Sequence, residues 1–568
     1  MVRETWQSLN GLWDYAIVEA NTDKMPDPEG KILVPFPVES SLSGVGRAVS
    51  ADSSLWYKRI IEIPKKWNGK RIMLNFDAVD WDSEVFVNGQ SMGRHTGGYT
   101  AFSYDITPYL YMNGKQTIEV KVLDATDKGN FQPRGKQVSN PKGIWYTRVT
   151  GIWQSVWMEA VPETSIESYY AVASLADSSL VVYPTIKNAK EGDTIKIDLI
   201  EGKVGYSAEE PGTNVIASIN TVSGKPARLV LKTFKTWSPD EPYLYGLNIS
   251  VVRGNETVDC VNGYTAMREV GTITDAAGHK RFALNGKPIF HYGPLDQGWW
   301  PDGLYTAPTD DALKHDIEMT KAYGFNMIRK HIKVEPARWY THCDQLGVMV
   351  WQDMPSNASN DLNHWGDNEY DEGTDFPLSE AAKANYYKEW TEIMAQRKAY
   401  PCIVVWVPFN EAWGQFNTPA VVAYTKSQDG TRLVNMASGG NWISGGVGDI
   451  MDSHNYPQPR MRVWDADLIN VVGEYGGLGL PLEGHLWQAD KNWGYQEFKS
   501  SEEVTDKYVE FTLTMKELEK QGVSGAVYTQ TTDVEGEVNG LMTYDRKVNK
   551  LDIDRVSKAN KAVIELLE

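Results

Sequence analysis

Cysteines and long apolar runs are scarce in this sequence, and each scarcity excludes a class of protein. The 568 residues include only three cysteines, Cys260, Cys343 and Cys402. They show neither metal-ligand spacing nor the even count of a disulfide framework. No apolar stretch approaches the roughly 20 residues that a membrane-spanning helix needs. We therefore predict inert core thiols, no bound metal or cofactor, and no association with a membrane.

Positively charged residues are also fewer than negatively charged ones. The chain has 56 Lys and Arg residues against 75 Asp and Glu, for a formal net charge of −19. Nucleic acid and anionic membrane surfaces repel a chain with this balance, so we predict no nucleic-acid partner. Aromatic residues are plentiful, with 21 Trp and 29 Tyr. Many of them lie in polar loops, as in proteins that stack aromatic rings on sugars.

The beginning of the chain leaves its cellular location open. Sequence with structural character starts by Trp6 and Trp13, and no signal peptide precedes it. Two interpretations remain: a cytoplasmic protein, or a periplasmic or secreted one from which a leader was removed. Assembly into a homo-oligomer is also left open.

The first half of the chain is typical of β-structure. A chain of this length exceeds one hydrophobic core, so several domains are expected. Residues 1–162 contain short alternating runs, one of them closed by the hairpin signal Asn88-Gly89. We predict a jelly roll there. Residues 163–272 hold further strands without helical pattern, which predicts an immunoglobulin-like β-sandwich.

The spacing of apolar residues changes in residues 273–568, where predicted strands alternate with predicted helices. This alternation predicts a (β/α)8 TIM barrel, although the fifth and sixth units have the weakest pattern. The eight strand candidates are 289–294, 325–329, 348–353, 403–409, 432–436, 450–454, 468–474 and 523–530. The clearest helices are 309–323, 335–346, 379–398, 502–521 and 555–567.

Two carboxylates occur at strand ends in this barrel. Glu411 follows the fourth strand, and Glu474 ends the seventh. A single Glu after a strand is most simply a loop residue. A second Glu at the end of another barrel strand favours a catalytic site instead. The two would face each other across the barrel mouth. Paired carboxyls about 5 Å apart cleave glycosidic bonds with retention of configuration.

Motifs along nearly the whole chain resemble glycoside hydrolase family 2, which includes β-galactosidases, β-glucuronidases and β-mannosidases. The resemblance implies an exo-acting, retaining β-glycosidase. It implies that Asn410-Glu411 is the acid/base motif and that Glu474 is the nucleophile. The supporting sequences are Leu9-Asn-Gly-Leu-Trp13, Thr150-Gly-Ile-Trp153-Gln154, Leu284-Asn-Gly-Lys-Pro288, Asn326-Met-Ile-Arg329-Lys-His331, Pro408-Phe-Asn-Glu411 and Gly473-Glu474-Tyr475-Gly476.

The sequence departs from the β-glucuronidases of this family at one motif. Those enzymes hold the sugar carboxylate with Asn-x-Lys, whereas this chain reads Glu535-Gly-Glu537-Val-Asn539 without a lysine. We therefore expect a β-galactoside substrate, with a mannoside, glucuronide or arabinoside as alternatives. A carbohydrate-binding protein without catalysis is a further alternative, and the presence of both Glu411 and Glu474 argues against it.

Other polar and aromatic residues near the strand ends complete the predicted site. Asn410 would bind the sugar 2-hydroxyl, and Arg329 would orient Glu474 unless it forms an interior salt bridge. An apolar wall from Trp406 or Trp413 would help to raise the pKa of Glu411. The remaining substrate-binding candidates are His331, Asp296, Asp353, Trp413, His454, Tyr456 and Tyr528.

Three loops attract attention because of their length or their aromatic residues. We expect the stretch 125–146, which includes Lys136 and Trp145, to approach the barrel mouth. Trp299, Trp300 and Tyr305 would form a sugar-stacking wall or simply pack their loop. The acidic stretch 356–378 is interpreted as a solvated surface loop, with a lid as the alternative.

Overall fold

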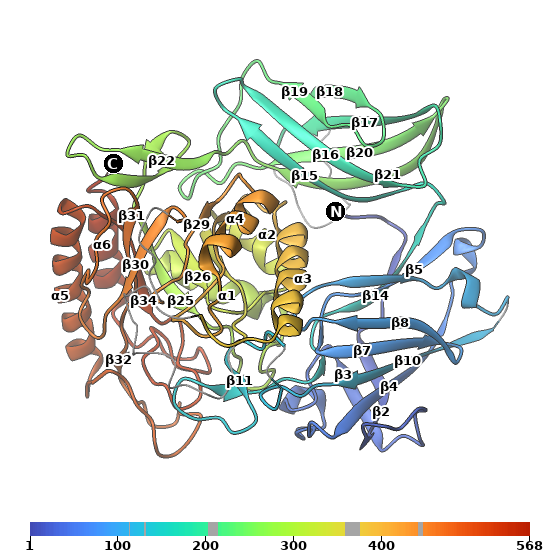
Figure 1. The fold of residues 1–568 in the computed structure, drawn as a ribbon, viewed down its shortest axis with the longest axis horizontal. Helices are drawn as coiled ribbons and strands as arrows, with labels where there is room; N and C mark the ends of the chain where they lie inside the picture. The colour runs from blue at the N-terminus through green and yellow to red at the C-terminus, as the bar shows by residue number, and fades with distance from the viewer. Residues whose placement is uncertain (113, 130–131, 203–213, 358–374, 441–446, 568) are drawn as a thin grey trace.

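The computed structural model describes residues 1–568 except 113, 130–131, 203–213, 358–374, 441–446 and 568. Three bodies lie side by side (Figure 1): two β-domains, blue and blue-green, and a larger domain coloured from yellow to red. None of the helices in the described ranges is long and apolar enough to cross a membrane.

The first domain is a sandwich of two antiparallel sheets, as predicted. A four-stranded sheet has the order β1-β14-β5-β9, and a six-stranded sheet the order β3-β2-β4-β10-β7-β8. Alternate residues of these strands are buried between the sheets, with Trp13, Leu74 and Val120 fully enclosed. The strands are β1 (Trp6–Ser8), β2 (Gly11–Glu19), β3 (Gly30–Val34), β4 (Ser53–Glu62), β5 (Arg71–Phe76), β7 (Asp82–Val87), β8 (Gln90–Thr96), β9 (Phe102–Asp105), β10 (Lys115–Leu123) and β14 (Val156–Val161).

The second domain is a smaller sandwich, again as predicted. Its sheets have the orders β15-β16-β19 and β18-β17-β20-β21. Its core contains Leu180, Ile197 and Ile249, all fully buried. The strands are β15 (Ser165–Ser174), β16 (Ser179–Lys187), β17 (Asp193–Ile200), β18 (Val215–Thr221), β19 (Ala227–Val230), β20 (Tyr245–Arg253) and β21 (Glu256–Thr265).

The third domain is a barrel of eight parallel strands in the order β29-β28-β27-β26-β25-β34-β31-β30. The ring is completed where the Asp449 backbone N–H donates to the Val434 carbonyl, at 2.9 Å. All eight predicted strands are present: β25 (His291–Asp296), β26 (Met327–Lys330), β27 (Met349–Asp353), β28 (Ile403–Val407), β29 (Leu433–Val434), β30 (Ile450–His454), β31 (Ile469–Gly476) and β34 (Val523–Thr529).

Helices cover the outside of this barrel. The five predicted helices are present as α1 (Asp310–Ala322), α2 (Ala337–Leu346), α3 (Glu380–Arg397), α5 (Ser501–Lys520) and α6 (Ile553–Ile564). Helix α4 (Thr418–Gln428) was not predicted. The link between β30 and β31, residues 455–468, contains no helix. The weak pattern of the sixth unit thus reflects a real departure from the regular barrel.

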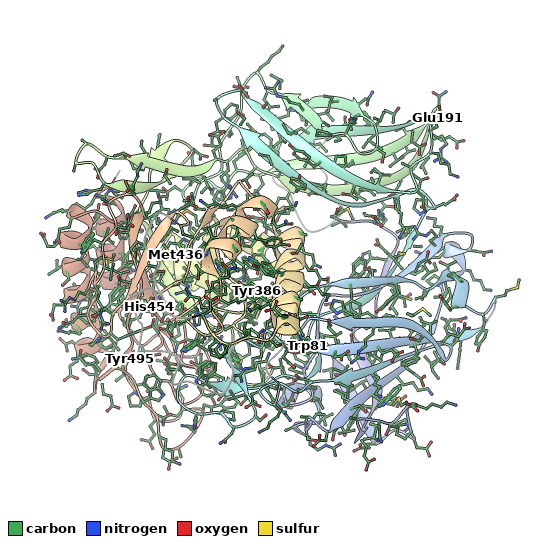
Figure 2. All side chains as sticks on the ribbon, in the orientation of Figure 1. Trp81, Glu191, Tyr386, Met436, His454 and Tyr495 are labelled. Carbon is green, nitrogen blue, oxygen red and sulfur yellow. The ribbon has the colours of Figure 1, made fainter. Side chains whose placement is uncertain are left out.

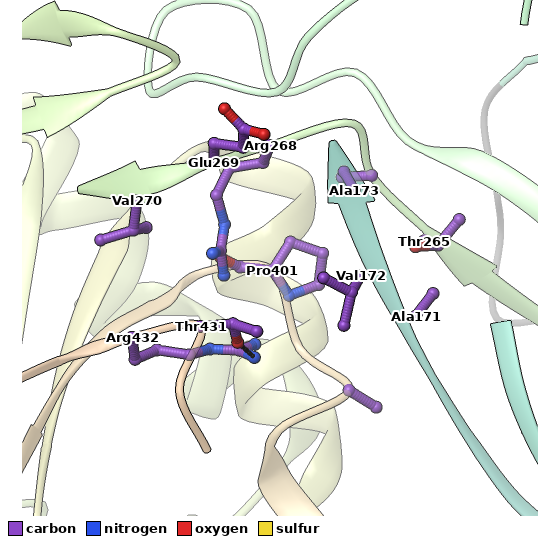
Figure 3. A pocket seen from close by; sticks show the side chains of 12 residues that line it. Ala171, Val172, Ala173, Thr265, Arg268, Glu269, Val270, Pro401, Thr431 and Arg432 are labelled. Atoms are coloured by element: carbon purple, nitrogen blue, oxygen red, sulfur yellow. Dashed lines mark hydrogen bonds between the residues drawn. The ribbon is translucent and has the colours of Figure 1, made fainter. Parts of the chain in front are cut away.

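The second domain is attached to the barrel at the start of β28. The Arg268 guanidinium donates to the carbonyl oxygens of Pro401, at 2.6 and 2.9 Å, and of Ile403, at 2.9 Å. Figure 3 shows Arg268 and Arg432 on either side of Pro401, in a pocket between the two domains. Both arginines bind carbonyls of the segment that leads into β28, so this strand is anchored at its first residue.

A small sheet closes the amino end of the barrel. Its strands are β22 (Val270–Thr274), β23 (Lys280–Leu284) and β24 (Lys287–Pro288). Phe282 of β23 stacks on the ring of His291, the first residue of β25, at 3.8 Å. The barrel is thereby sealed at its amino end, and polar side chains can reach a ligand only at its carboxyl end.

Candidate active site

The end of β28 turns sharply and presents Glu411. Every residue of Ile403–Val407 is buried, as expected for a strand in a parallel barrel. Glu411 and Ala412 then adopt left-handed conformations with φ of 49° and 61°. A non-glycine residue held this way costs about 1–3 kcal/mol, and such conformations cluster at functional sites. The Glu411 backbone N–H donates to Ser438 at 2.9 Å and fixes the turn.

Glu474 lies on β31 and faces Glu411 across the barrel. A carboxylate oxygen of each residue lies within 4.8 Å of the other. Burial and the nearby charge of Glu474 raise the pKa of Glu411. Burial alone would raise the pKa of Glu474, but the charges of His454 and Arg329 outweigh it and lower that pKa. The two environments therefore favour one protonated and one ionised carboxyl group.

Arg329, on β26, connects the predicted residues around Glu474. Its guanidinium donates to Glu474 at 3.1 Å, to both oxygens of Asp353 and to Asn410 Oδ1 at 2.7 Å. Asp353 also lies 3.1 Å from His331 Nδ1. These contacts orient Glu474 and Asn410. Both interpretations of Arg329 therefore apply, because the residue forms a buried salt bridge with Asp353 and also binds Glu474. Asn410 Nδ2 is buried and has no acceptor among the described residues.

His454, at the end of β30, is hydrogen-bonded to Glu411. Its Nδ1 lies 2.8 Å from Glu411 Oε1 and 3.6 Å from Glu474 Oε2. The Ser438 hydroxyl donates to Asp452 at 2.6 Å, so its oxygen accepts from His454 Nε2 at 2.8 Å. A proton is therefore held on Nε2, and Nδ1 shares a second proton with Glu411. Figure 2 shows His454 inside the barrel domain.

Tyr456 holds the other side of Glu474. Its hydroxyl donates to Glu474 Oε2 at 2.5 Å and lies 2.6 Å from Thr529 Oγ1. Its ring stacks on Tyr495 at 3.9 Å. Tyr495 is 44% exposed. Partial burial raises the pKa of its hydroxyl, and the charges of Glu537, Glu411 and Glu474 raise it further. The sequence analysis missed Tyr495, because a tyrosine in the polar loop after β31 carries no distinguishing pattern.

The loop 125–146 of the first domain reaches the barrel mouth, as predicted. The backbone N–H groups of Arg134 and Gly135 donate to the Ser356 carbonyl at 3.1 and 3.2 Å. Trp145 packs against Trp413 with ring centroids 5.0 Å apart. Lys136 is 5% exposed, and its charge lowers the pKa of both Glu411 and Glu474. The first domain thus contributes directly to the surroundings of the carboxylate pair.

Glu537 is a further acidic residue at this site that the sequence analysis missed. The Tyr146 hydroxyl donates to its Oε2, and Asn539 Nδ2 donates to its Oε1 at 2.9 Å. It is 2% exposed, and burial raises its pKa. The signal was present in the sequence, because Glu537 and Asn539 lie in the stretch that lacks the glucuronidase lysine.

Three predicted residues lie away from the carboxylate pair. Asp296 accepts from Lys330 at 2.8 Å and from the Gly298 backbone, and no recorded contact joins it to Glu411 or Glu474. Tyr528 packs outward against Tyr475 and Tyr508 of helix α5. Trp406 likewise packs on Trp390 of α3 and cannot form the wall beside Glu411. Successive side chains of a strand point to opposite faces, and the sequence analysis assigned these two aromatic residues to the wrong face.

The two loop predictions have different outcomes. Trp299, Trp300 and Tyr305 are buried, at 4%, 6% and 1% exposure, so they pack their loop and form no exposed stacking wall. Trp300 lies under the guanidinium of Arg546 at 3.9 Å. Most of the acidic stretch 356–378 falls on residues 358–374, outside the described residues.

One group of side chains has the composition of a metal site. Glu411, His454 and Glu474 place one ligand atom each within 4.8 Å of one another. The 2.8 Å contact between Glu411 and His454 is a hydrogen-bond length, shorter than the roughly 3.3 Å between two ligand atoms on a tetrahedral Zn²⁺ ion. The absence of a metal and of a cofactor stays a prediction.

Three family models match the chain in the order of its domains. The model of the glycosyl hydrolases family 2 sugar binding domain matches residues 30–162, and the model described as glycosyl hydrolases family 2 matches 164–268. The model of the family 2 TIM barrel domain matches 277–551. The two sandwiches and the barrel with facing carboxylates are those of a glycoside hydrolase. The chain belongs to glycoside hydrolase family 2, as its motifs predicted.

Similar proteins in the family are named either β-galactosidase or β-glucuronidase. A β-galactosidase of Thermoanaerobacter pseudethanolicus is 27% identical over 63% of this chain and 44% of its own length. A putative β-glucuronidase of Formosa agariphila is 25% identical over 64% of this chain and 40% of its own length. The chain therefore spans less than half the length of these relatives.

Solved structures share the complete fold. A β-D-glucuronidase of Dictyoglomus thermophilum has a TM-score of 0.76 at 19% identity and covers 99% of this chain and 98% of its own. The β-glucuronidase of Ruminococcus gnavus has a TM-score of 0.77 at 18% identity, over 100% and 99%. At this identity the likeness establishes the fold alone.

Proposed function

We propose that this chain is a retaining, exo-acting β-glycosidase that hydrolyses terminal β-galactosides by double displacement. The observation that carries the proposal is the pair Glu411 and Glu474, whose oxygens approach within 4.8 Å while their pKa values shift in opposite directions. A separation of about 5 Å suits direct attack by one carboxylate, because no room is left for a water molecule between them.

Each residue of the pair has a distinct role in this mechanism. Glu474, held ionised by Arg329 and Tyr456, attacks the anomeric carbon and forms the glycosyl-enzyme. Glu411, protonated and hydrogen-bonded to His454, gives its proton to the leaving oxygen. As a carboxylate it then takes a proton from water, which releases the sugar. Asn410 Nδ2, for which the described residues offer no acceptor, donates to the sugar 2-hydroxyl.

Two observations favour a neutral sugar over a uronic acid. Glu537 lies at the site in the stretch where family β-glucuronidases carry Asn-x-Lys, and its carboxylate would repel a sugar carboxylate. Several relatives are also named β-galactosidases. The β-glucuronidase names of other relatives keep glucuronide hydrolysis as the second candidate.

A panel of nitrophenyl β-glycosides tests the proposal. We expect the highest kcat/KM for the β-galactoside and at least about 100-fold less for the β-glucuronide, as a repelled charge would cause. NMR of the first-formed product should show the β-anomer. Preference for a mannoside or arabinoside would keep the mechanism and change the substrate. A first-formed α-anomer would exclude double displacement, and sugar binding without any turnover would indicate a carbohydrate-binding protein.

A further inference from the structure

Lys136 is a buried cation beside the carboxylate pair, and no partner for its charge is found in the described part of the chain. The residue is 5% exposed, and no hydrogen bond or ion pair of its ammonium group is found among the described residues. Lysine is almost never this buried unless it is paired, so the ammonium group of Lys136 is available to an acceptor on a ligand. The other buried lysines of the barrel, Lys330, Lys333 and Lys550, each bind two or three oxygen atoms.

The backbone around Lys136 is held firmly against the barrel. Residues Gln137–Val138 form strand β11, which pairs in parallel with β12 (Tyr146–Thr147). The Tyr146 backbone N–H donates to the Lys136 carbonyl at 3.0 Å. On the other side, Gly135 donates to the Ser356 carbonyl. The position of the ammonium group is therefore a property of the fold and not of a freely moving loop.

Tyr146 connects Lys136 to Glu537. The Lys136 ammonium lies 5.7 Å from the centre of the Tyr146 ring, and the hydroxyl of the same ring donates to Glu537. Burial raises the pKa of Glu537 and the charge of Lys136 opposes that rise, yet no ion pair joins the two among the residues described. A donor from the first domain and an anchored acceptor from the barrel thus both lie close enough to Glu474 for their charges to act on it.

We infer that Lys136 determines sugar specificity by donating a hydrogen bond to a ring-substituent hydroxyl of a neutral sugar, whose own proton is accepted by Glu537. A hydroxyl group suits this position, because it both accepts and donates. A sugar carboxylate would satisfy Lys136 but would face Glu537 and Glu474. The inference rests on the proposed function, and it assigns to the first domain a direct contact with the substrate.

Lys136→Met tests the inference, because it removes the ammonium group and keeps the apolar stem. Nitrophenyl β-galactoside is compared with its 4-deoxy and 6-deoxy analogues. We expect kcat/KM on the complete sugar to fall about 10- to 150-fold, as when a charged hydrogen bond is lost. On the analogue that lacks the contacted hydroxyl, the variant should differ from wild type by less than about 3-fold. Lys142→Met, an exposed lysine of the same loop, is the matched control and should be unchanged.

A second variant examines the shared hydroxyl. Glu537→Gln should lose activity on the same sugar, and the double variant should lose little more than the worse single one, because both partners act through one group. Equal losses by Lys136→Met on every analogue, or no loss on any, would overturn the inference. So would a wild-type preference for the β-glucuronide that Lys136→Met removes.

Failure of the proposed function would be recognised separately. If the wild type hydrolyses no glycoside of the panel, galactose and its deoxy analogues are titrated by calorimetry into the wild type and into Lys136→Met. The same 10- to 150-fold loss, confined to the sugars that carry the contacted hydroxyl, is then expected in Kd. Equal affinities of both proteins for galactose would overturn the inference.

Discussion

Two buried groups of charged side chains lie at the carboxyl end of the barrel, and they differ in how fully their donors are satisfied. In the first, which we term the closed cluster, Lys330 binds two carboxylates and Lys333 binds two carbonyls and a carboxylate. In the second, the open cluster, one amide donor and one ammonium group have no acceptor among the described residues. The closed cluster is Asp296, Lys330, Lys333 and Glu335, and the open cluster is Lys136, Asn410, Glu411, His454 and Glu474.

This difference distinguishes charged groups that stabilise the fold from charged groups that are available to a substrate. In the closed cluster, Asp296 and Glu335 outweigh burial and raise the pKa of Lys330 to about 12, so this ammonium group stays charged. Burial lowers the pKa of Lys333 to about 8, but all three of its oxygen acceptors belong to the protein. In the open cluster, a proton is shared between Glu411 and His454 across 2.8 Å, and hydrogen-bonding capacity is left for a ligand. Free donors and shared protons are features that a substrate uses, whereas lysines whose donors are all bound by the protein stabilise the fold.

Glu474→Ala should have the largest effect on the open cluster. Without the nucleophile no glycosyl-enzyme forms, so turnover of every aryl glycoside should fall on the order of 10⁴-fold or more. Added azide should take the place of the missing carboxylate and give the α-glycosyl azide, identified by NMR. Glu483→Ala, an exposed glutamate in the loop after β31, should keep wild-type activity. Near wild-type turnover of Glu474→Ala would show that the assigned site is wrong.

Glu411→Ala should be milder and should depend on the leaving group. A nitrophenolate departs without protonation, whereas an alkyl galactoside should lose about 10²–10⁴-fold because its leaving oxygen needs a proton. Azide should attack the glycosyl-enzyme from the side where water enters and give the β-glycosyl azide. Recovery of the α-azide from this variant would reverse the roles of the two glutamates.

Lys330→Met should disturb the closed cluster without affecting the chemistry. Removal of one partner of a buried ion pair costs about 3–5 kcal/mol, because the carboxylates of Asp296 and Glu335 are left uncompensated. The expected result is a lower unfolding free energy with kcat unchanged per folded molecule, measured by urea titration and active-site counting. Lys520→Met, which breaks an exposed pair with Glu517, should cost less than about 1 kcal/mol. A fall in kcat of the folded Lys330 variant would place the closed cluster in the site.

The fold could be predicted from the sequence because its signals are local. The alternating runs of the first two domains and the apolar barrel strands each reflect the face that is buried. The joint through Arg268 has no sequence signal, because it depends on carbonyls far along the chain.

The candidate site was predictable only in part, for a physical reason. Residues at strand ends, such as Glu411 and Glu474, come together because the barrel brings parallel ends to one mouth. Which face a side chain takes was harder to judge, and Tyr528 shows the error. Tyr495 comes from a loop whose path depends on packing against Tyr456 and Trp493, so the sequence provides no rule that places it.

His454→Asn should shift the pH profile of kcat/KM, which tests the role of the histidine in the open cluster. In the wild type, the acid limb reports ionisation of Glu474, whose pKa is lowered, and the basic limb reports loss of the Glu411 proton, whose pKa is raised. The charge of His454 lowers the pKa of both carboxyl groups, so its removal should raise both and move both limbs of kcat/KM to higher pH. His485→Asn, which breaks a similar histidine–carboxylate pair with Asp545 away from the mouth, should leave the profile in place. A lower maximum with unmoved limbs would indicate that His454 only supports the structure of the site.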